Sequence, residues 1–107
     1  MEVSEDYLAK IRRAVRIKTI TADGDAELTD IINECRADLE SLGVRTEKTQ
    51  DEADAIILGA VRCFARWKMA ADEYEANVNR EDYMLMRDEL RRKSAYAKQE
   101  GPAYEDD

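Results

Sequence analysis

The sequence predicts an all-α protein, a small bundle of about four helices that ends in an extended, charged C-terminal helix. Composition is the first reason, because one proline and four glycines among 107 residues are too few for a chain of strands and turns. Charge is the second, since 39% charged and 44% hydrophobic residues are typical of helices with one solvated and one buried face. The third is spacing: apolar residues recur three and four positions apart, the period of an amphipathic helix.

The length of the chain fits one domain. We assign residues 1–100 to a single helical domain and residues 101–107 to an acidic, flexible tail beyond Gly101 and Pro102. No apolar run approaches the roughly 18–20 residues that a membrane span requires. The N-terminus begins with acidic residues rather than a secretory signal, so we expect synthesis in a reducing cytoplasm and no membrane contact.

The first helix is expected to begin after Ser4, a good N-cap residue. Glu5 and Asp6 follow at the positive end of the helix dipole, where carboxylates are favoured. Positions 7, 8, 11, 14 and 15 then form a single apolar stripe. The β-branched run at residues 17–21 interrupts the helical pattern and is expected to be extended.

The second helix is expected to follow a turn, with Asp23 or Asp25 as its cap. Its apolar face consists of Leu28, Ile31, Ile32, Cys35, Leu39 and Leu42. Arg36 is placed on the opposite, polar side. Gly43 stands where a left-handed C-cap glycine is expected, and Val44 can then fold back onto the last turn.

The third helix is expected to be the central element of the core. Thr49 and Glu52 have the spacing of a capping box, which would start this helix. Its apolar residues, which are Ala53, Ile56, Ile57, Ala60, Val61 and Phe64, cover more than one side. Gly59 in mid-helix costs roughly 1 kcal/mol relative to alanine, so we expect a close helix crossing there to offset that cost. Phe64 and Trp67 are interpreted as core or subunit-contact residues.

The last helix is expected to begin near Asn79, after a connection that includes residues 71–78. Its apolar stripe is thin, with Tyr83, Met86 and Leu90, and its other residues are largely charged. Such a helix gains little by packing on its own core, so the pattern predicts that another chain covers part of it. Ion pairs along the helix surface, such as Asp88 with Arg92, are the alternative reading of these charges.

Nothing in the sequence indicates catalysis, a metal or a cofactor. The chain has no histidine, and none of its three serines lies in a nucleophile elbow. The segment from Asp23 resembles half of a calcium loop, but Leu28 stands where the sixth position requires glycine. Cys35 and Cys63 are expected to be buried free thiols. A net charge of −8 argues against a surface that reads DNA.

The order of these segments resembles the small head–tail connector proteins of tailed bacteriophages, which are also called head-completion adaptors or DNA-packaging proteins. The similarity covers about residues 4–95, and Arg66-Trp67-Lys68 departs from the tyrosine and small residues common in that family. The matching positions are Asp25, Leu28, Ile31, Ile32, Ala37, Asp38, Leu39, Gly43, Val44, Asp54, Ile56, Ile57, Ala60, Val61 and Phe64.

The resemblance implies a non-enzymatic virion structural protein. It would be made in the bacterial host cytoplasm and located in the neck of the virion. It would dock as a ring of twelve identical subunits under the portal protein, extend the DNA channel, help retain the packaged genome and join the next neck or tail-completion protein. Packaged DNA would pass through the ring without sequence-specific binding. The C-terminal helix would be a main contact to the portal or to neighbouring subunits.

The residues that we expect to face partners are Tyr83, Met86, Arg87, Arg91, Arg92, Lys93 and Tyr96. A second hypothesis is a small cytoplasmic helical regulator that binds protein or nucleic acid through its basic C-terminal helix. Self-association separates the two hypotheses, because a connector forms rings whereas a regulator is a monomer or a twofold dimer.

Overall fold

The computed structural model describes residues 2–98, and within that range it contains five helices and no strand. The expected acidic tail, residues 101–107, lies outside the described residues. The all-α prediction is confirmed, and the helix beyond the expected four is a single turn. The helices are α1 (Glu5–Ala14), α2 (Ala22–Ser41), α3 (Thr46–Thr49), α4 (Ala55–Lys68) and α5 (Glu73–Arg92).

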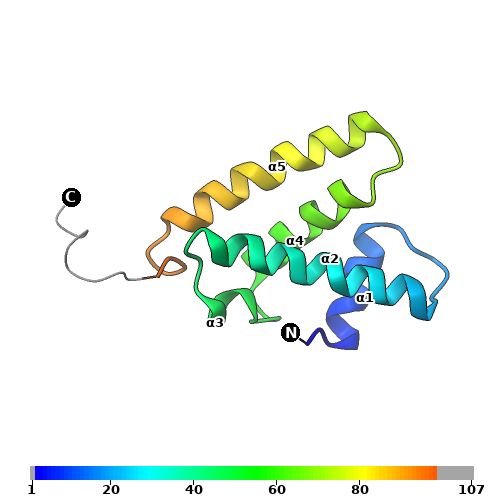
Figure 1. The fold of residues 1–107 in the computed structure, drawn as a ribbon, viewed down its shortest axis with the longest axis horizontal. Coiled ribbons are helices and arrows are strands. Elements are labelled where there is room, and N and C mark those ends of the chain that lie inside the picture. Colours follow the sequence, from blue (N-terminus) through cyan, green and yellow to red (C-terminus); the bar gives the residue numbers. More distant parts are fainter. Residues whose placement is uncertain (1, 99–107) are drawn as a thin grey trace.

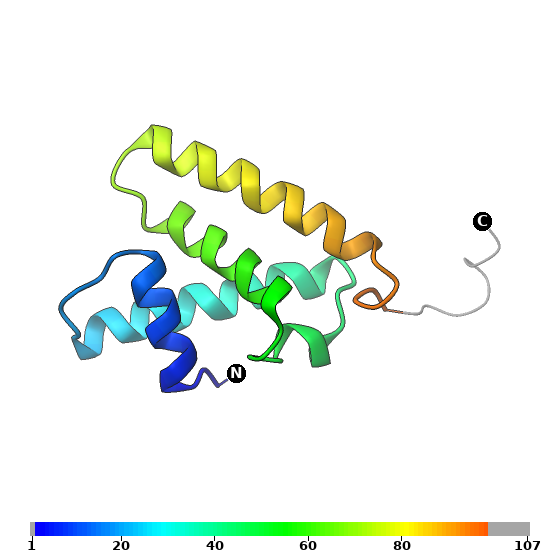
Figure 2. The same ribbon diagram turned by 180° about the vertical axis from the view of Figure 1, so that it is seen from behind.

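Helix α4 is central, as the sequence predicts, because α1, α2 and α5 all pack against it. Helices α4 and α5 form an antiparallel pair joined by a short turn, and α5 lies at the outer edge of the molecule in both views (Figures 1 and 2). Helix α1 crosses α2 near the start of α2 (Figure 2). The outer position of α5 leaves much of its surface available to other chains.

The core is made mostly by the apolar faces of α2 and α4, with Tyr7, Leu8 and Ile11 added from α1. Phe64 is buried and contacts two other rings edge-on: the ring centroids are 5.4 Å from Trp67 and 5.0 Å from Tyr83. Such aromatic pairs add about 0.5–1.5 kcal/mol beyond the area that they bury. The core assignment of Phe64 is therefore confirmed, and Tyr83 joins α5 to the same cluster.

The predicted N-cap of α1 is correct, whereas the predicted N-cap of α2 is wrong. Ser4 caps α1 as predicted, and its Oγ accepts a hydrogen bond from the Tyr7 amide at 3.1 Å. Helix α2 begins earlier than expected, because Thr21 is its N-cap and accepts from the Gly24 amide at 2.9 Å. Asp25, one of the two expected caps, instead pairs with Arg12, with 2.8 Å between Oδ2 and Nη2.

The predicted capping box of Thr49 and Glu52 is wrong. Thr49 is the last residue of α3, it is buried, and its hydroxyl donates to Glu40 and to the Thr46 carbonyl. Asp54 caps α4 instead, and its Oδ1 accepts from the amides of the second and third helical residues, both at 2.9 Å. Thr49 therefore uses its hydroxyl in contacts with Glu40 and with its own helix rather than as a cap of α4.

The predicted cap of the last helix, Asn79, is also wrong. Asp72 caps α5, since its Oδ1 accepts from the Glu75 amide at 2.8 Å. Asn79 lies in mid-helix and its side-chain amide donates back to the Glu75 carbonyl at 2.9 Å. Residues 73–78, which were expected to be part of a connection, therefore form the first turns of a 20-residue helix.

Of the predictions made for two glycines, the one for Gly43 is confirmed and the one for Gly59 is wrong. Gly43 has a φ of 100°, the left-handed conformation that was predicted, and Val44 is buried with its amide bonded to the Leu39 carbonyl at 3.1 Å. The close crossing predicted at Gly59 is wrong. Among the described residues, no neighbouring atom lies within 4 Å of the point that a β-carbon would occupy there. The space above Gly59 is open.

Candidate interaction surface

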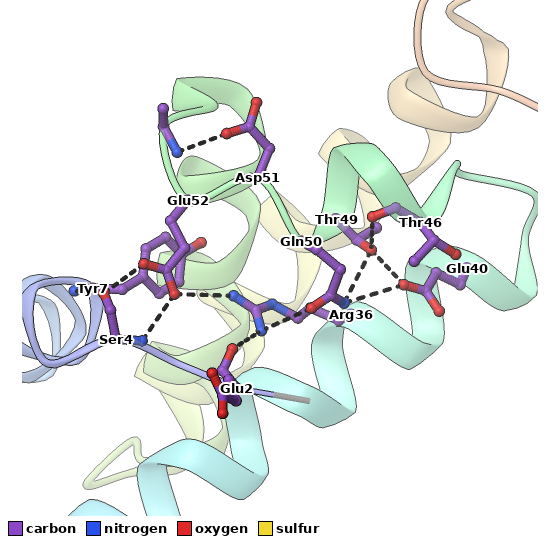
Figure 3. Close-up of polar contacts among 11 residues, drawn as sticks. Glu2, Ser4, Tyr7, Arg36, Glu40, Thr46, Thr49, Gln50, Asp51 and Glu52 are labelled. Atoms are coloured by element: carbon purple, nitrogen blue, oxygen red, sulfur yellow. Dashed lines mark hydrogen bonds and ion pairs between the residues drawn. The ribbon is translucent and has the colours of Figure 1, made fainter.

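A buried arginine fixes the N-terminal segment of the chain (Figure 3). Arg36 was expected on the polar side of its helix, but it is fully buried. Its Nη1 donates to the Glu2 carbonyl at 3.0 Å and to the Gln50 side chain at 3.3 Å. Its Nη2 lies 3.7 Å from a Glu52 carboxylate oxygen, and its guanidinium lies 5.4 Å from the centroid of the Tyr7 ring.

Glu52 completes this Arg36 cluster by holding the start of α1. Its carboxylate accepts from both the amide and the hydroxyl of Ser4, with 2.9 Å to the amide nitrogen (Figure 3). Partial burial raises the pKa of Glu52, but the hydrogen bonds from Ser4 and the charge of Arg36 outweigh it and leave the pKa below its ordinary value. The Arg36 guanidinium stays protonated throughout the physiological range, so it serves as a fixed charge that holds these segments together.

A second polar cluster joins α5 to α2 and contains two of the seven expected partner-facing residues. Asp38 accepts from the Tyr83 hydroxyl at 2.7 Å and from Arg87 Nε at 2.8 Å. Tyr83 is fully buried and also accepts a weak bond from the Cys35 thiol at 3.8 Å. Burial raises the pKa of Asp38, but the bonds from Arg87 and Tyr83 more than compensate and lower it overall. Both α5 residues are thus used within the chain.

Burial also shifts the pKa values of Cys35 and Tyr83 in this cluster. It raises the pKa of the Cys35 thiol to about 12 and raises the pKa of the Tyr83 hydroxyl as well. Cys35 and Cys63 are both buried free cysteines, as the sequence predicts. A thiol that stays protonated and inaccessible is a poor nucleophile, so Cys35 acts as a packing residue.

Met86 and Tyr96 also make contacts within the chain. Met86 is half-buried against the core. The Tyr96 hydroxyl donates to Asp54, the cap of α4, at 2.8 Å, and the Tyr96 carbonyl accepts from the Arg45 amide at 2.8 Å. The segment after α5 is therefore tied back to the α3–α4 region.

The other three candidates, Arg91, Arg92 and Lys93, are exposed at the end of α5. Asp88 binds the first two, with 3.0 Å to Arg91 Nε and 2.7 Å to Arg92 Nη2, so the expected Asp88–Arg92 pair is confirmed. Exposed pairs of this kind contribute about 0–1 kcal/mol, and a partner carboxylate can replace them at little cost. The interface role of all seven residues stays a prediction.

Helix α5 also carries an exposed apolar surface that was not predicted from the sequence. Tyr74 is 79% exposed, Val78 40% and Leu85 69%, and we call these three residues the outer stripe. At 100° per residue they fall within a 40° arc, on the side of the helix opposite the buried Tyr83. The spacing of four and then seven residues was visible in the sequence. It was missed because residues 71–78 were expected to be a connection.

A groove runs between α4 and α5 on a different side of α5. Its volume is about 330 Å³. It is lined by Ala55, Ile56, Gly59, Met86, Glu89, Leu90 and Lys93. Ile56 is 47% exposed in this α4–α5 groove, and Gly59 forms part of its floor without a side chain. The groove is mainly apolar and has charged side chains at one end.

The described residues include neither a cluster of potential metal ligands nor a membrane-spanning helix. No group of three or more potential metal ligands occurs among residues 2–98. Within the same range no helix is both long and apolar enough to cross a bilayer. What the geometry provides is an outer helix with exposed apolar, acidic and basic regions, which is suited to contact with other proteins.

Comparison with known proteins agrees with this reading. A model of the family described as phage connector protein matches residues 7–90. No curated protein and no solved structure matches the chain. Members of this structural family are generally not enzymes, and their role implies contact with other head and tail proteins of a phage. Because the match spans most of the sequence, the chain belongs to the phage connector protein family.

Proposed function

We propose that this protein is a head–tail connector that assembles as a ring of twelve subunits under the portal. There it would extend the DNA channel, help to retain the packaged genome and present a docking surface for the next neck or tail-completion protein. The family match over residues 7–90 is the observation that carries this proposal. Its location would be the neck of the virion.

The charge of the chain supports a role as a conduit. A net charge of −8 makes a ring of these subunits strongly acidic. DNA binds tightly where cations displace the counterions around its phosphates, and an acidic wall offers few such cations. Packaged DNA would therefore slide through the ring with little adhesion and without sequence preference.

The basic end of α5 supports contact with the portal or a neck protein. Arg91, Arg92 and Lys93 are exposed together at one end of an otherwise acidic molecule. An acidic partner surface would be attracted to this end, and the electrostatic steering would raise its association rate. The half-buried Met86 would lie at the edge of such an interface.

Native mass measured over a wide protein concentration range, with electron microscopy of any large species, tests the ring. We expect a closed ring of about a dozen subunits, either alone or on purified portal. The variant Arg91→Glu/Arg92→Glu should bind the portal more weakly and lose the salt dependence of binding, whereas Arg13→Glu, at an exposed site on α1, should not. If neither the free protein nor a mixture with portal forms rings, the proposal is wrong.

The cluster of three exposed basic residues also favours the second candidate, a helical regulator. Such a protein would be a monomer or a compact twofold dimer, and its binding to nucleic acid would weaken steeply with salt. A twofold dimer that binds DNA through Arg91 to Lys93 would replace the connector proposal.

A further inference from the structure

We propose that neighbouring subunits of the ring exchange α1, so that α1 of each subunit packs on α2 and α4 of the next copy. This inference rests on the proposed ring and names the element that joins its subunits. The hinge is the α1–α2 connection, residues 15–21. In the closed form this connection bends and α1 crosses α2 of its own chain (Figure 2), whereas in the exchanged form it is extended.

The surface that receives α1 defines the occupant as a second copy of this chain. Tyr7, Leu8 and Ile11 are buried in the core between α1, α2 and α4. Arg12 pairs with Asp25 of α2, with 2.8 Å between the two side chains. These contacts join α1 to residues that follow the connection, so α1 of another copy can make all of them with the same geometry. The closed and the exchanged forms therefore differ mainly in the connection.

The connection is strained where α1 ends. Arg16 has a φ of 64°, and it is the one non-glycine residue with a positive φ among residues 2–98. The Ile17 amide then donates to the Arg12 carbonyl at 2.9 Å, which closes the end of the helix in the way that glycine usually permits. A residue with a β-carbon is disfavoured in this left-handed conformation by a factor of about 5–30. Extension of the connection removes that penalty.

The sequence of the connection also favours the extended form. Five of its seven residues are β-branched, and such residues are enriched in extended segments. Ile20, one of the five, is 63% exposed in the closed form. Seven extended residues span roughly 23 Å, which exceeds the 18 Å extent of the molecule along its shortest axis. The connection is therefore long enough for α1 to reach an adjacent subunit.

The other end of α1 is held by an incompletely satisfied anchor. Arg36 Nε and the Tyr7 hydroxyl are buried and make no hydrogen bond within the described residues. Buried polar groups without hydrogen bonds destabilise the docked form, and they regain bonds to water when α1 and the segment before it lift away. The release that exchange requires is therefore made easier at this end of the helix.

The direction of exchange sets the kind of assembly. Helix α1 and the surface that receives it are different parts of one chain, so a contact between copies is heterologous. An open row of subunits has one undocked α1 and one empty receiving surface at its two ends. Closure of the ring fills both. A reciprocal exchange between two copies would instead stop at a twofold dimer.

Cross-linking within the assembled protein tests the exchange. The variant Ala14→Cys/Arg66→Cys carries one thiol on α1 and one on α4, at a contact where Arg66 Nε lies 3.1 Å from the Ala14 carbonyl oxygen. A short bis-maleimide should join α1 of one subunit to α4 of the next. Denatured samples should therefore contain covalent multiples of the 12.3 kDa chain, up to the full ring.

A matched pair of thiols serves as the control. Glu34 and Lys68 lie on α2 and α4 with 3.6 Å between their charged groups, and neither belongs to α1 or the connection. The variant Glu34→Cys/Lys68→Cys should therefore be cross-linked within single chains and should run as a monomer after denaturation. Cys35 and Cys63 are buried and stay protected in both variants. Circular dichroism verifies that every variant keeps its helices.

Two substitutions at the hinge give an independent measurement. Arg16→Gly relieves the left-handed conformation in the closed form, so the protein concentration required for half-maximal assembly should rise about 5–30-fold. Arg16→Ala removes the same exposed side chain but keeps a β-carbon, so it should assemble like the wild type. Equal assembly of the glycine and alanine variants would refute the hinge.

The outcomes separate this inference from the proposed function. Rings of Ala14→Cys/Arg66→Cys that yield only monomers after cross-linking and denaturation would refute the exchange and leave the connector function standing. Covalent dimers from a twofold assembly would refute the one-directional exchange. Failure to form rings, either alone or on the portal, would refute the function and this arrangement together.

Discussion

Removal of the Asp38 carboxylate should destabilise the protein by about 2 kcal/mol. In Asp38→Ala the buried Tyr83 hydroxyl loses the acceptor of its proton, and an unsatisfied buried group costs about 1–3 kcal/mol. The half-exposed pair with Arg87 adds about 0.5–1 kcal/mol, because solvent screens it. Alanine in mid-helix returns about 0.5 kcal/mol through its higher helix propensity. For a domain of this size the net loss lowers Tm by about 8–15 °C.

A double-mutant cycle isolates the hydrogen bond from these other terms. Tyr83→Phe should cost about 0.5–1.5 kcal/mol in the wild type, yet it should be neutral or stabilising in Asp38→Ala, where the hydroxyl has no acceptor. Urea denaturation followed by the fluorescence of Trp67, the single tryptophan, measures all four proteins. Arg87→Ala is the control and should cost at most about 1 kcal/mol. Equal costs of Tyr83→Phe in the two backgrounds would refute the reasoning.

Three further predictions concern stability, and urea midpoints measure each. Gly43→Ala should destabilise the protein by about 1–2 kcal/mol, because the φ of 100° at this position is unfavourable for alanine. Gly59→Ala should stabilise it by about 0.5–1 kcal/mol, because alanine is the better residue within a helix. Both sites have room for a β-carbon, so equal effects of the two substitutions would contradict the conformational explanation. Ser4→Ala should cost about 1–2 kcal/mol, more than the cap variant Thr21→Ala, because only Ser4 also donates to the Glu52 carboxylate. Folding lowers the pKa of Glu52, so the stability that its carboxylate contributes is complete above the ordinary pKa of 4.5 and is lost as the pH falls below that value. Glu52→Gln should therefore lose less stability in acid than the wild type does. An unchanged dependence of stability on pH in this variant would argue against the Ser4–Glu52 link.

The sequence was sufficient for the fold class because helical periodicity follows from local chemistry. Most residues of the apolar faces of α2 and α4 could be predicted from their spacing, and so could the Gly43 cap. Ala53 and Ile56 are the exceptions, because both were expected on the apolar face of the central helix and both are exposed. Helix starts were less secure, because several residues in one loop can cap and the choice depends on distant contacts. Thr49 ends α3 and its hydroxyl donates to Glu40 in another helix, whereas Asp54 directly precedes α4 and caps it.

The interaction surfaces were harder to predict than the helices. Arg36 follows Ile32 by four positions and precedes Leu39 by three, so its place on the buried face could have been found from spacing alone. Its partners at Glu2 and Gln50 could not, because they depend on how remote segments pack. The outer stripe was missed because acidic residues around Tyr74 obscured the helical register.

The cluster around Arg36 also sets the order in which the molecule can be completed during translation. Ser4 is held by Glu52, which lies 48 residues later, and α1 packs on α2 and on α4. The ribosome therefore releases the first helix before Glu52 and α4 have been synthesised, so α1 cannot complete its contacts until α4 has emerged. Helices α4 and α5 can pack together as soon as both have emerged, because they are adjacent in the chain. The first helix to be synthesised is thus among the last to complete its tertiary contacts.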